Sequence, residues 1–374
     1  MDFQTRRNFV RSAALVSGAS LVSGKAESAV LSTYTTSGNI VTLIVKPETA
    51  DATAAIQQAL TYAAASGKML RIPGGDYYIA GTLSVSMVRH KPFSITGDGA
   101  AITNLYFTGS GGLQIDGNFA TDYDPDQDRV RIQGLTFNNI RTTAGIALHL
   151  QRLGGFSLSD FFIVNFDIGL LLDNSLKAHV SDGYIGYCNT GVLAPSASYS
   201  TPSLSSANLL LFTRVGITEC ANYGLSWTGG TSLTLDSCEI ANNKSIGVAI
   251  HAKEGLTIVT LAGTNYFEAN AVNDVYILHQ SPASYNLTGA FFNFGNLTPN
   301  SVSILLDANQ LSHGSPRASL NLEGSGFQQY RGRGAVYVSA LIGAGYDGLS
   351  VSNRTTIYVP STSTPNFAPP IRVL

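Results

Sequence analysis

The most constraining feature of this chain is a repeat of 22 to 27 residues that runs through its middle. Each repeat contains three short apolar strands and an asparagine-rich turn, with no helix between them. One longer spacing includes a serine- and proline-rich insertion near 195–207, which suits a surface loop. The pattern predicts a β-solenoid of about nine or ten coils, in which each coil buries its inner face by stacking on its neighbours. The aligned positions are spaced by 24, 22, 33, 23 and 27 residues: Gly145, Gly169, Gly191, Gly224, Gly247 and Asp274.

Alternation along the predicted strands separates inward-facing from outward-facing residues. The first and third residues after each aligned position are apolar or small, so we expect them to face the core. The second and fourth residues should then face outward. Asparagine and glycine tolerate the left-handed backbone conformation that a sharp corner between strands requires, which explains the composition of the turns.

Composition limits the partners that such a solenoid can have. Charged residues make up 12% of the 374 residues, and the formal net charge is −2. No stripe of lysine and arginine occurs, which argues against nucleic acid, because phosphates need clustered cations. The three cysteines match neither a disulfide framework nor a zinc pattern, so we expect small buried residues at Cys188, Cys220 and Cys238.

The first 28 residues are typical of a bacterial export signal. Arg6 and Arg7 precede an apolar stretch over 12–22, which is too short to span a bilayer. Paired arginines followed by Phe9 resemble a twin-arginine signal; the alternatives are a general secretory signal and a basic terminus that arose by chance. We therefore expect the twin-arginine export machinery as a partner and the periplasm or the exterior as the location. No later segment is apolar and long enough to span a membrane.

The N-terminal part carries a family resemblance. Asp51 is the predicted N-cap of a helix that Gly67 ends. An apolar strand, a Pro-Gly-Gly-x-Tyr segment over 73–77 and an Ile-x-Gly-x-Gly turn over 95–99 follow. This order resembles the opening of the pectate lyase-like superfamily of right-handed parallel β-helices. That superfamily includes polysaccharide lyases, rhamnogalacturonase-like hydrolases and phage tailspikes.

The resemblance, which covers roughly residues 45 to 280, implies an all-β, right-handed, single-stranded parallel β-helix with an N-terminal capping helix. The predicted organisation is a signal peptide over 1–28, a lead-in over 29–50, the β-helix over 51–280, and final coils with an extended tail over 281–374. The polygalacturonase-like motifs are not reproduced: only Ser312-His313-Gly314 comes near the Gly-His-Gly motif. The family's catalytic residues are therefore not carried over to this chain.

The strongest candidate for a catalytic site is an outward column on the strands. His149 and Asp173 occupy it in neighbouring coils, about 4.8 Å apart, and Arg152 and Lys177 follow in the next turns. A lyase acting on uronate chains needs a base and a cation that stabilises the enolate. His149 or Lys177 would be the base, Arg152 would bind the carboxylate, and Asp173 would orient the histidine. The alternative is a solvated surface pair.

A second candidate is a pair of carboxylates at a turn, Asp160 and Asp182. Two carboxylates in adjacent coils suit Ca²⁺ or the acid and base of a hydrolase; the alternative is an ordinary turn role for aspartate. Four alternating aspartates in one loop resemble a calcium loop, but glutamines stand at the positions of its glycine and its glutamate. They are Asp122, Asp124, Asp126 and Asp128.

Aromatic residues provide candidate sugar-binding positions. Tyr184, Tyr187 and Tyr223 could stack on sugar rings, and the alternative for each is packing in the core or in a turn. His251 lies in the same outward column as His149, so we expect it to contact substrate.

Two functions remain open at this point. The first is an exported lyase or hydrolase acting on an acidic or acetylated polysaccharide. The second is a non-catalytic β-helix that binds or assembles polysaccharide. Fold alone does not separate them.

Overall fold

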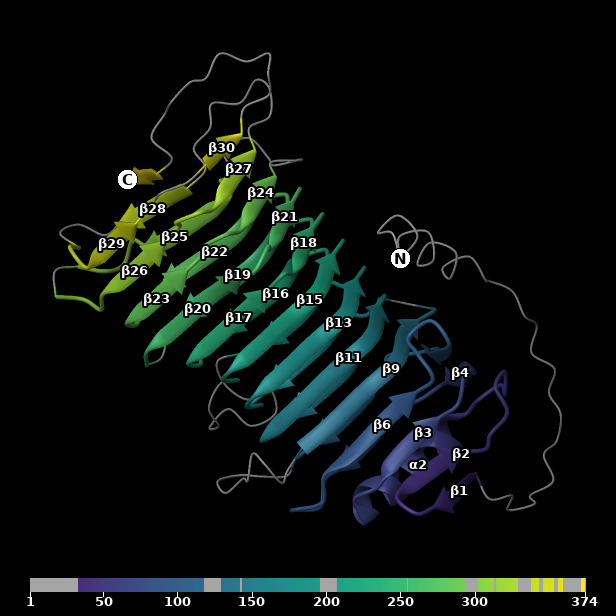
Figure 1. Cartoon of the computed structure of the whole chain (residues 1–374). Helices are drawn as coiled ribbons and strands as arrows, with labels where there is room; N and C mark the ends of the chain where they lie inside the picture. The colour runs from purple at the N-terminus through teal and green to yellow at the C-terminus, as the bar shows by residue number, and fades with distance from the viewer. Residues whose placement is uncertain are drawn as a thin grey trace.

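Strands of successive coils lie side by side along one axis, from the purple N-terminal end to the yellow C-terminal end (Figure 1). The computed structural model describes residues 33–117, 129–141, 143–195, 207–253, 255–293, 302–312, 314–328, 338–342, 346–352, 356–358 and 371–373.

One sheet, sheet B, contains a single strand from each of eleven coils, and all of its strand pairs are parallel. Within the described residues this is one coil more than the repeat length predicts. Its strands are β5 (Leu83–Ser86), β8 (Leu113–Asp116), β10 (Ile146–Gln151), β12 (Ile168–Asp173), β14 (Thr190–Ala194), β16 (Tyr223–Thr228), β19 (Ile246–Ala252), β22 (Asn273–His279), β25 (Ile304–Ala308), β28 (Val338–Ile342) and β31 (Ile371–Val373).

The other sheet, sheet A, receives two segments from most coils. The first segments are β2 (Ile40–Leu43), β3 (Met69–Ile72), β6 (Phe93–Gly97), β17 (Ser232–Asp236), β20 (Thr257–Ala262), β23 (Ala283–Asn286), β26 (Ala318–Asn321) and β29 (Leu349–Ser352). The second segments are β4 (Gly75–Ile79), β7 (Thr103–Phe107), β18 (Glu239–Ala241), β21 (Tyr266–Glu268), β24 (Phe291–Asn293), β27 (Gly326–Gln328) and β30 (Thr356–Tyr358).

In four central coils the two segments of sheet A join into one bent strand. These strands are β9 (Arg129–Asn139), β11 (Gly155–Val164), β13 (Ala178–Gly186) and β15 (Leu210–Thr218). The bend in each falls on one residue with a positive φ, which stays outside the ladder of paired residues. The bending residues form a row across the coils: Gly134, Asp160, Asp182 and Arg214, followed by Ser237 and Gly263 in the next two coils.

This stacked, parallel arrangement is a right-handed parallel β-helix, as predicted. Its first strand, β2, is joined to β1 (Tyr34–Ser37) in an antiparallel hairpin before it pairs in parallel with β3. Sheet strands therefore lie on both sides of the predicted boundaries at 51 and 280. In the part of the chain that the structure describes, no helix is long and apolar enough to cross a bilayer.

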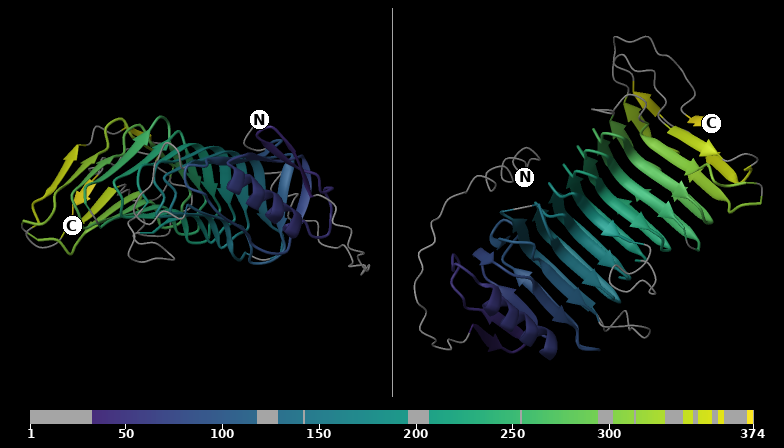
Figure 2. Two further views of the ribbon diagram at one scale, coloured as in Figure 1. Left: turned by 90° about the horizontal axis from the view of Figure 1, so that it is seen from below. Right: turned by 180° about the vertical axis from the view of Figure 1, so that it is seen from behind.

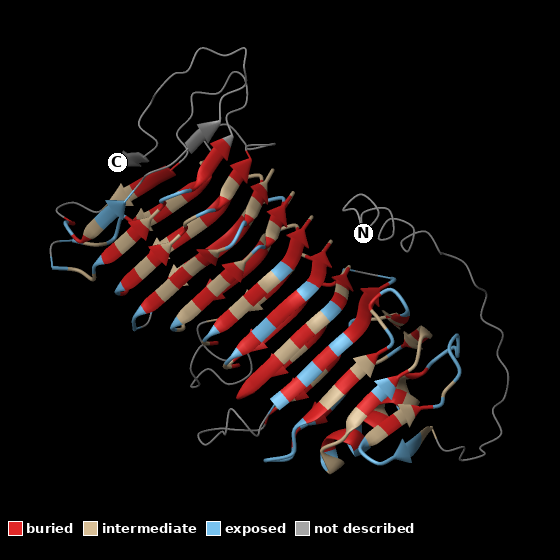
Figure 3. Cartoon of the chain, in the orientation of Figure 1, coloured by how far each residue is buried: buried red, intermediate tan, exposed pale blue. Residues whose placement is uncertain are grey.

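The predicted inward residues form the core. Leu172, Trp227 and Ile250 are at most 1% exposed, and so are Leu150 and Ile277, which pair with Leu172 and Ile250 in the neighbouring coils. Along sheet A, buried and more exposed positions alternate, which shows as red bands separated by tan or pale blue (Figure 3). Burying one large aliphatic side chain contributes about 1.5–3 kcal/mol, so this column supplies much of the stability. The three cysteines are free and buried, as expected.

The helix α2 (Thr53–Ser66) covers the N-terminal end of the solenoid (Figure 2). Its buried face, which includes Ile56 and Leu60, packs against the first coils, so the apolar end of the stack is protected. Gly67 ends it with a left-handed φ of 65°, as predicted. The predicted N-cap is displaced by one residue: Ala52 is the N-cap, and the carboxylate of Asp51 still accepts the N–H of Thr53 at 2.9 Å.

The asparagine-rich turns have two separate roles. Asn165 and Asn242 take the left-handed conformation at the corner between the sheets, where Tyr187, Glu219 and Ala269 stand in other coils. Asn243 and Asn270 lie inside the corner and form a buried ladder: the Nδ2 of Asn243 donates to the Oδ1 of Asn270 at 2.8 Å. Each of these two asparagines accepts on its Oδ1 from the preceding coil and donates from its Nδ2, so the ladder joins successive coils.

The ladder ends on a buried carboxylate, Asp274. The Nδ2 of Asn270 and the Oγ of Ser303 each donate to it at 2.8 Å. Burial nevertheless raises the pKa of Asp274 to about 7, because removal from water disfavours the charged form.

An aspartate introduced into the inward column should unfold the protein. Ile250→Asp would bury an uncompensated carboxylate, which costs several kcal/mol of a typical stability of about 5–15 kcal/mol. Thr234→Asp, on the outer face of sheet A, is the matched control and should change the melting temperature little. A cooperatively melting Ile250→Asp protein with wild-type stability would contradict the facing assignment.

Asp274 should make stability depend on pH. Its pKa is about 7 in the folded protein and near 3.8 when exposed, so the folded state binds the extra proton between these values. The stabilisation is complete below about pH 4 and is lost as the pH rises through 7, by up to about 1.4 kcal/mol per unit. Asp274→Asn should therefore melt higher than wild type at pH 8 and show a flatter pH profile. Identical profiles for the two proteins would refute this role.

Candidate functional site

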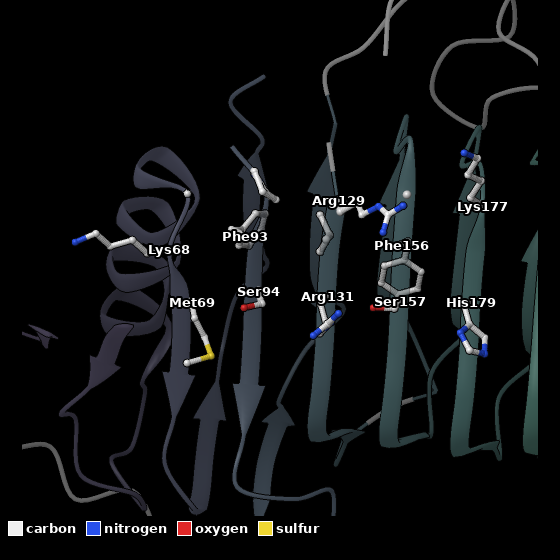
Figure 4. Close-up of a pocket in the computed structure, with 14 residues that line it drawn as sticks. Lys68, Met69, Phe93, Ser94, Arg129, Arg131, Phe156, Ser157, Lys177 and His179 are labelled. Carbon is white, nitrogen blue, oxygen red and sulfur yellow. The ribbon is translucent and has the colours of Figure 1, made fainter. Parts of the chain in front are cut away.

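A groove of about 540 Å³ crosses the outer face of sheet A near its N-terminal end (Figure 4). It runs across β3, β6, β9, β11 and β13, so it follows the axis of the solenoid. Its floor includes the edges of Phe93 and Phe156, both 4% exposed. Around this apolar floor stand polar and cationic side chains: Arg129, Arg131, Lys177, His179, Ser94 and Ser157. We call this feature the cationic groove.

The strand alternation is what presents these side chains to solvent. On β9, Arg129 and Arg131 are exposed, while Val130 between them is 1% exposed. On β13, His179 is exposed between two buried neighbours. Register then brings Arg131 opposite Ser157, and Ser157 opposite His179. Three neighbouring strands thus contribute adjacent side chains to one row.

All the charged side chains among the described lining residues of the groove are cationic. Among the described residues that line it, none is aspartate or glutamate. The stem of Lys68 also lines the groove, but its ammonium points away (Figure 4) and lies 5.8 Å from the ring of Tyr62. Arg129, Arg131 and Lys177 therefore provide the permanent positive charge, and His179 provides an imidazole beside them. Such a surface suits an anionic ligand.

The predicted catalytic column lies on a different sheet. His149, on β10 of sheet B, is opposite Leu171, and Asp173 is opposite Gln151. The first repeat was therefore misaligned by two residues: Ala147, not Gly145, is level with Gly169. His149 and Asp173 still meet diagonally, with 3.4 Å between Nε2 and Oδ2. The Asp173 side chain is fully buried and the His149 side chain is 12% exposed.

Arg152 and Lys177 were predicted to converge on this pair, but the structure places their side chains elsewhere. Arg152 forms a bidentate ion pair with Asp116, with 2.9 Å between Nε and Oδ1. Lys177 lies beyond the corner between the sheets and lines the cationic groove. Asp116 was missed because the acidic loop that follows it interrupts the repeat. The carboxylate of Asp116 neutralises Arg152, so this arginine is not available as a carboxylate clamp.

The predicted aromatic contacts have mixed outcomes. Tyr184 points outward by register but is buried, since its ring lies across Gly186 and its hydroxyl meets that of Thr218 at 2.7 Å. It is therefore not an exposed stacking platform. Tyr187 is half-buried at a corner with a φ of 55°, and Tyr223 is half-buried at the start of β16. Neither lines the cationic groove.

His251 does lie on the outer face of sheet B, but it packs among neighbours. Its ring meets Tyr276 edge-on with centroids 6.2 Å apart, and its Nδ1 is 3.4 Å from the hydroxyl of Thr228. Burial and the charge of Lys253 lower the pKa of His251, which disfavours the charged form of the imidazole.

The predicted metal pair occupies the row of bending residues. Asp182 forms a bidentate ion pair with Arg214, at 2.7 and 2.9 Å, and these hydrogen bonds lower its pKa. The carboxylate of Asp160 lies 3.3 Å from the N–H of Ala100. A calcium ion bound there would have to displace Arg214. Across the described ranges, no group of three or more histidine, cysteine, aspartate or glutamate side chains is arranged to hold a metal ion.

Two predictions fall outside the described residues. They are the export signal over 1–28 and the acidic loop from Asp122 to Asp128. The groove itself was not predicted, although one signal for it exists. Arg131 and His179 each stand between two apolar residues of a predicted strand, and Arg129 comes two residues before Arg131. Recognising them as one site required the register between coils.

The sequence matches no protein-family model and no curated protein. Among solved structures, the chain is similar to ORF18 of Geobacillus virus E2, with a TM-score of 0.55 and 15% identity over 84% of this chain and 59% of that one. It is similar to an alginate lyase from Paenibacillus sp. FPU-7, with a TM-score of 0.51 and 14% identity over 80% and 97%. The Dettilon tailspike protein gives a TM-score of 0.50 and 15% identity over 86% and 68%.

These likenesses and the stacked coils define the class of the protein: it is a right-handed parallel β-helix protein. That architecture is shared by carbohydrate-active enzymes and by phage tailspikes. The chain spans about three fifths of the length of the Geobacillus virus protein. At identities of this size the similarity concerns the fold, so the activity has to be argued from the site.

Proposed function

We propose that this protein is a polysaccharide lyase that binds an acidic polysaccharide in the cationic groove and cleaves it by β-elimination. The observation that carries the proposal is the composition of the groove: two arginines, a lysine and a histidine over an apolar floor, with no carboxylate among its described lining residues. The fold supports it, because a similar architecture serves an alginate lyase. A uronate chain supplies both the negative charge and the apolar ring faces that such a groove can hold.

The chemistry is assigned to two side chains on the β13 side of the groove. Lys177 and His179 both line the groove and are two residues apart, so they can reach one sugar. Lys177 binds the uronate carboxylate and stabilises the enolate. His179 accepts the proton from the carbon beside that carboxylate. The bond to the leaving sugar oxygen then breaks, that oxygen takes up a proton, and an unsaturated uronate remains.

Hydrolysis is a weaker candidate for this groove. Most glycoside hydrolases use two carboxylates on either side of the scissile bond, at about 5 to 9.5 Å from each other. The groove lining described here offers none. On sheet B, Asp116 is bound to Arg152, and Asp173 is fully buried behind His149. Neither carboxylate is placed to protonate a glycosidic oxygen directly.

The proposal predicts which histidine matters. His179→Ala should lower the turnover of an acidic polysaccharide by about 10²- to 10⁴-fold, since it removes the proton acceptor. The assay follows unsaturated-uronate absorbance and new reducing ends together. His149→Ala, on the other sheet, is the matched control and should retain wild-type turnover. His179→Ala should melt close to wild type, and turnover is compared at a temperature well below the melting temperature of both variants.

Three outcomes would contradict the proposal. Loss of activity in His149→Ala but not in His179→Ala would move the catalytic centre to sheet B. New reducing ends without unsaturated products would show a hydrolase. Tight binding of acidic polysaccharide without any product would show a non-catalytic binding protein.

We also propose that the protein acts outside the cytoplasm after export by the twin-arginine route. The basis is the pair Arg6 and Arg7 ahead of a short apolar stretch. Changing both arginines to lysine should leave the full-length protein in the cytoplasmic fraction, because the receptor reads the arginine pair rather than the charge. Fractionation of cells expressing each form measures this. Unchanged export of the double variant would exclude this route.

A further inference from the structure

The positive charges of the cationic groove lie on alternate strands. Arg129 and Arg131 are on β9, while Lys177 and His179 are at the start of β13. The strand between them, β11, presents Gly155 and Ser157 at the corresponding positions. The register between β9 and β11 shows this alternation, since Arg129 is opposite Gly155 and Arg131 is opposite Ser157.

The two coils that flank these charged strands present no charge in the row that contains Arg131, Ser157 and His179. Ser94 on β6 is opposite Arg131, and Leu211 on β15 is opposite His179. From β9 to β15 the parallel row nearer the bend is uncharged as well: it contains Gln133, Ser159, Ser181 and Thr213. The groove therefore offers two cationic stations, Arg129 with Arg131 and Lys177 with His179, which lie two strand spacings apart. The positions between and beside them in these rows are uncharged.

The strand spacing determines how far apart the acidic groups of a ligand must lie to meet both stations. Neighbouring strands lie about 4.8 Å apart, so the stations are separated by roughly 10 Å along the solenoid axis. One sugar of an extended polysaccharide spans about one strand spacing. A chain lying along the groove thus places every second sugar at a cationic station and the sugar between them over Gly155 and Ser157.

We infer that the preferred ligand is a polysaccharide in which an acidic sugar alternates with a neutral one. This inference rests on the proposed function, because it specifies the acidic polysaccharide that the same groove binds. Acidic groups meet Arg129 and Arg131 at one station and Lys177 at the other. The neutral sugar meets β11, where a hydroxyl and a glycine provide no charge that would repay the desolvation of a carboxylate.

Two ligands of equal length separate this inference from simple charge attraction. The first is a hyaluronan hexasaccharide, in which glucuronate alternates with neutral N-acetylglucosamine. The second is an oligogalacturonate hexasaccharide, in which every sugar is charged. Calorimetry at 4 °C with the full chain gives both affinities, and absorbance confirms that the ligands stay intact. The alternating ligand should bind at least as tightly, with the same salt dependence, because both ligands fill two stations.

Tighter binding of the fully charged ligand would contradict the inference. A groove that acts only through charge would bind the fully charged hexasaccharide more tightly and with a steeper salt dependence. That outcome would overturn the alternation while leaving the proposed function intact. Failure of both ligands to bind would remove the groove as a site for acidic polysaccharide, and the inference would fall with it.

Relocating one charge tests the spacing in the protein itself. The double change Arg131→Ser with Ser157→Arg keeps the net charge but moves one of the two arginine charges from β9 to β11, directly beside the second station. It should weaken binding of the hyaluronan hexasaccharide by about two- to fivefold, as should Arg131→Ser alone, since one ion contact is lost. Arg131→Lys is the matched control that keeps charge and position. Wild-type affinity in the relocated variant would show that position along the axis is irrelevant.

Discussion

Every coil of this protein depends on the parallel backbone pairing that joins it to the next one. A single coil of three short strands cannot bury its inner face by itself, so it becomes stable only when neighbouring coils stack on it. The inward column of aliphatic and aromatic side chains and the asparagine ladder both follow from this constraint. The two ends of the stack are exceptions, and α2 protects the apolar end at the N-terminus.

The same pairing turns the outer face into a surface with regular spacing. Each coil lies one strand spacing further along the solenoid axis than the coil before it. Side chains that are far apart in sequence therefore become neighbours at a fixed separation. Arg131, Ser157 and His179 are brought together in this way from three successive coils. A groove built from such rows naturally follows the solenoid axis, and an extended polysaccharide has the matching linear shape.

Electrostatics distinguishes the two polar regions on the outer faces. On sheet B, His149 meets Asp173 and Arg152 meets Asp116, so both of these side chains have an acidic partner. On sheet A, the groove lining gathers cations without an acid among its described residues. A region whose charges pair with one another has little left to attract a polyanion, whereas a groove whose described charged side chains are all cationic can attract one from a distance.

The sequence by itself determined the solenoid, its inward column and its capping helix, because these depend on periodicity and local propensity. Even the N-cap was displaced by only one residue, from Asp51 to Ala52. Only the tertiary structure decided where the candidate site lies. An error of two residues in aligning one coil changes which side chains are opposite each other, as the diagonal contact of His149 with Asp173 shows. Lys177 was assigned to the wrong face because a turn decides on which side of a corner its side chain lies. The groove emerged only when the register placed scattered cations in adjacent strands, since a low overall charge conceals a local concentration.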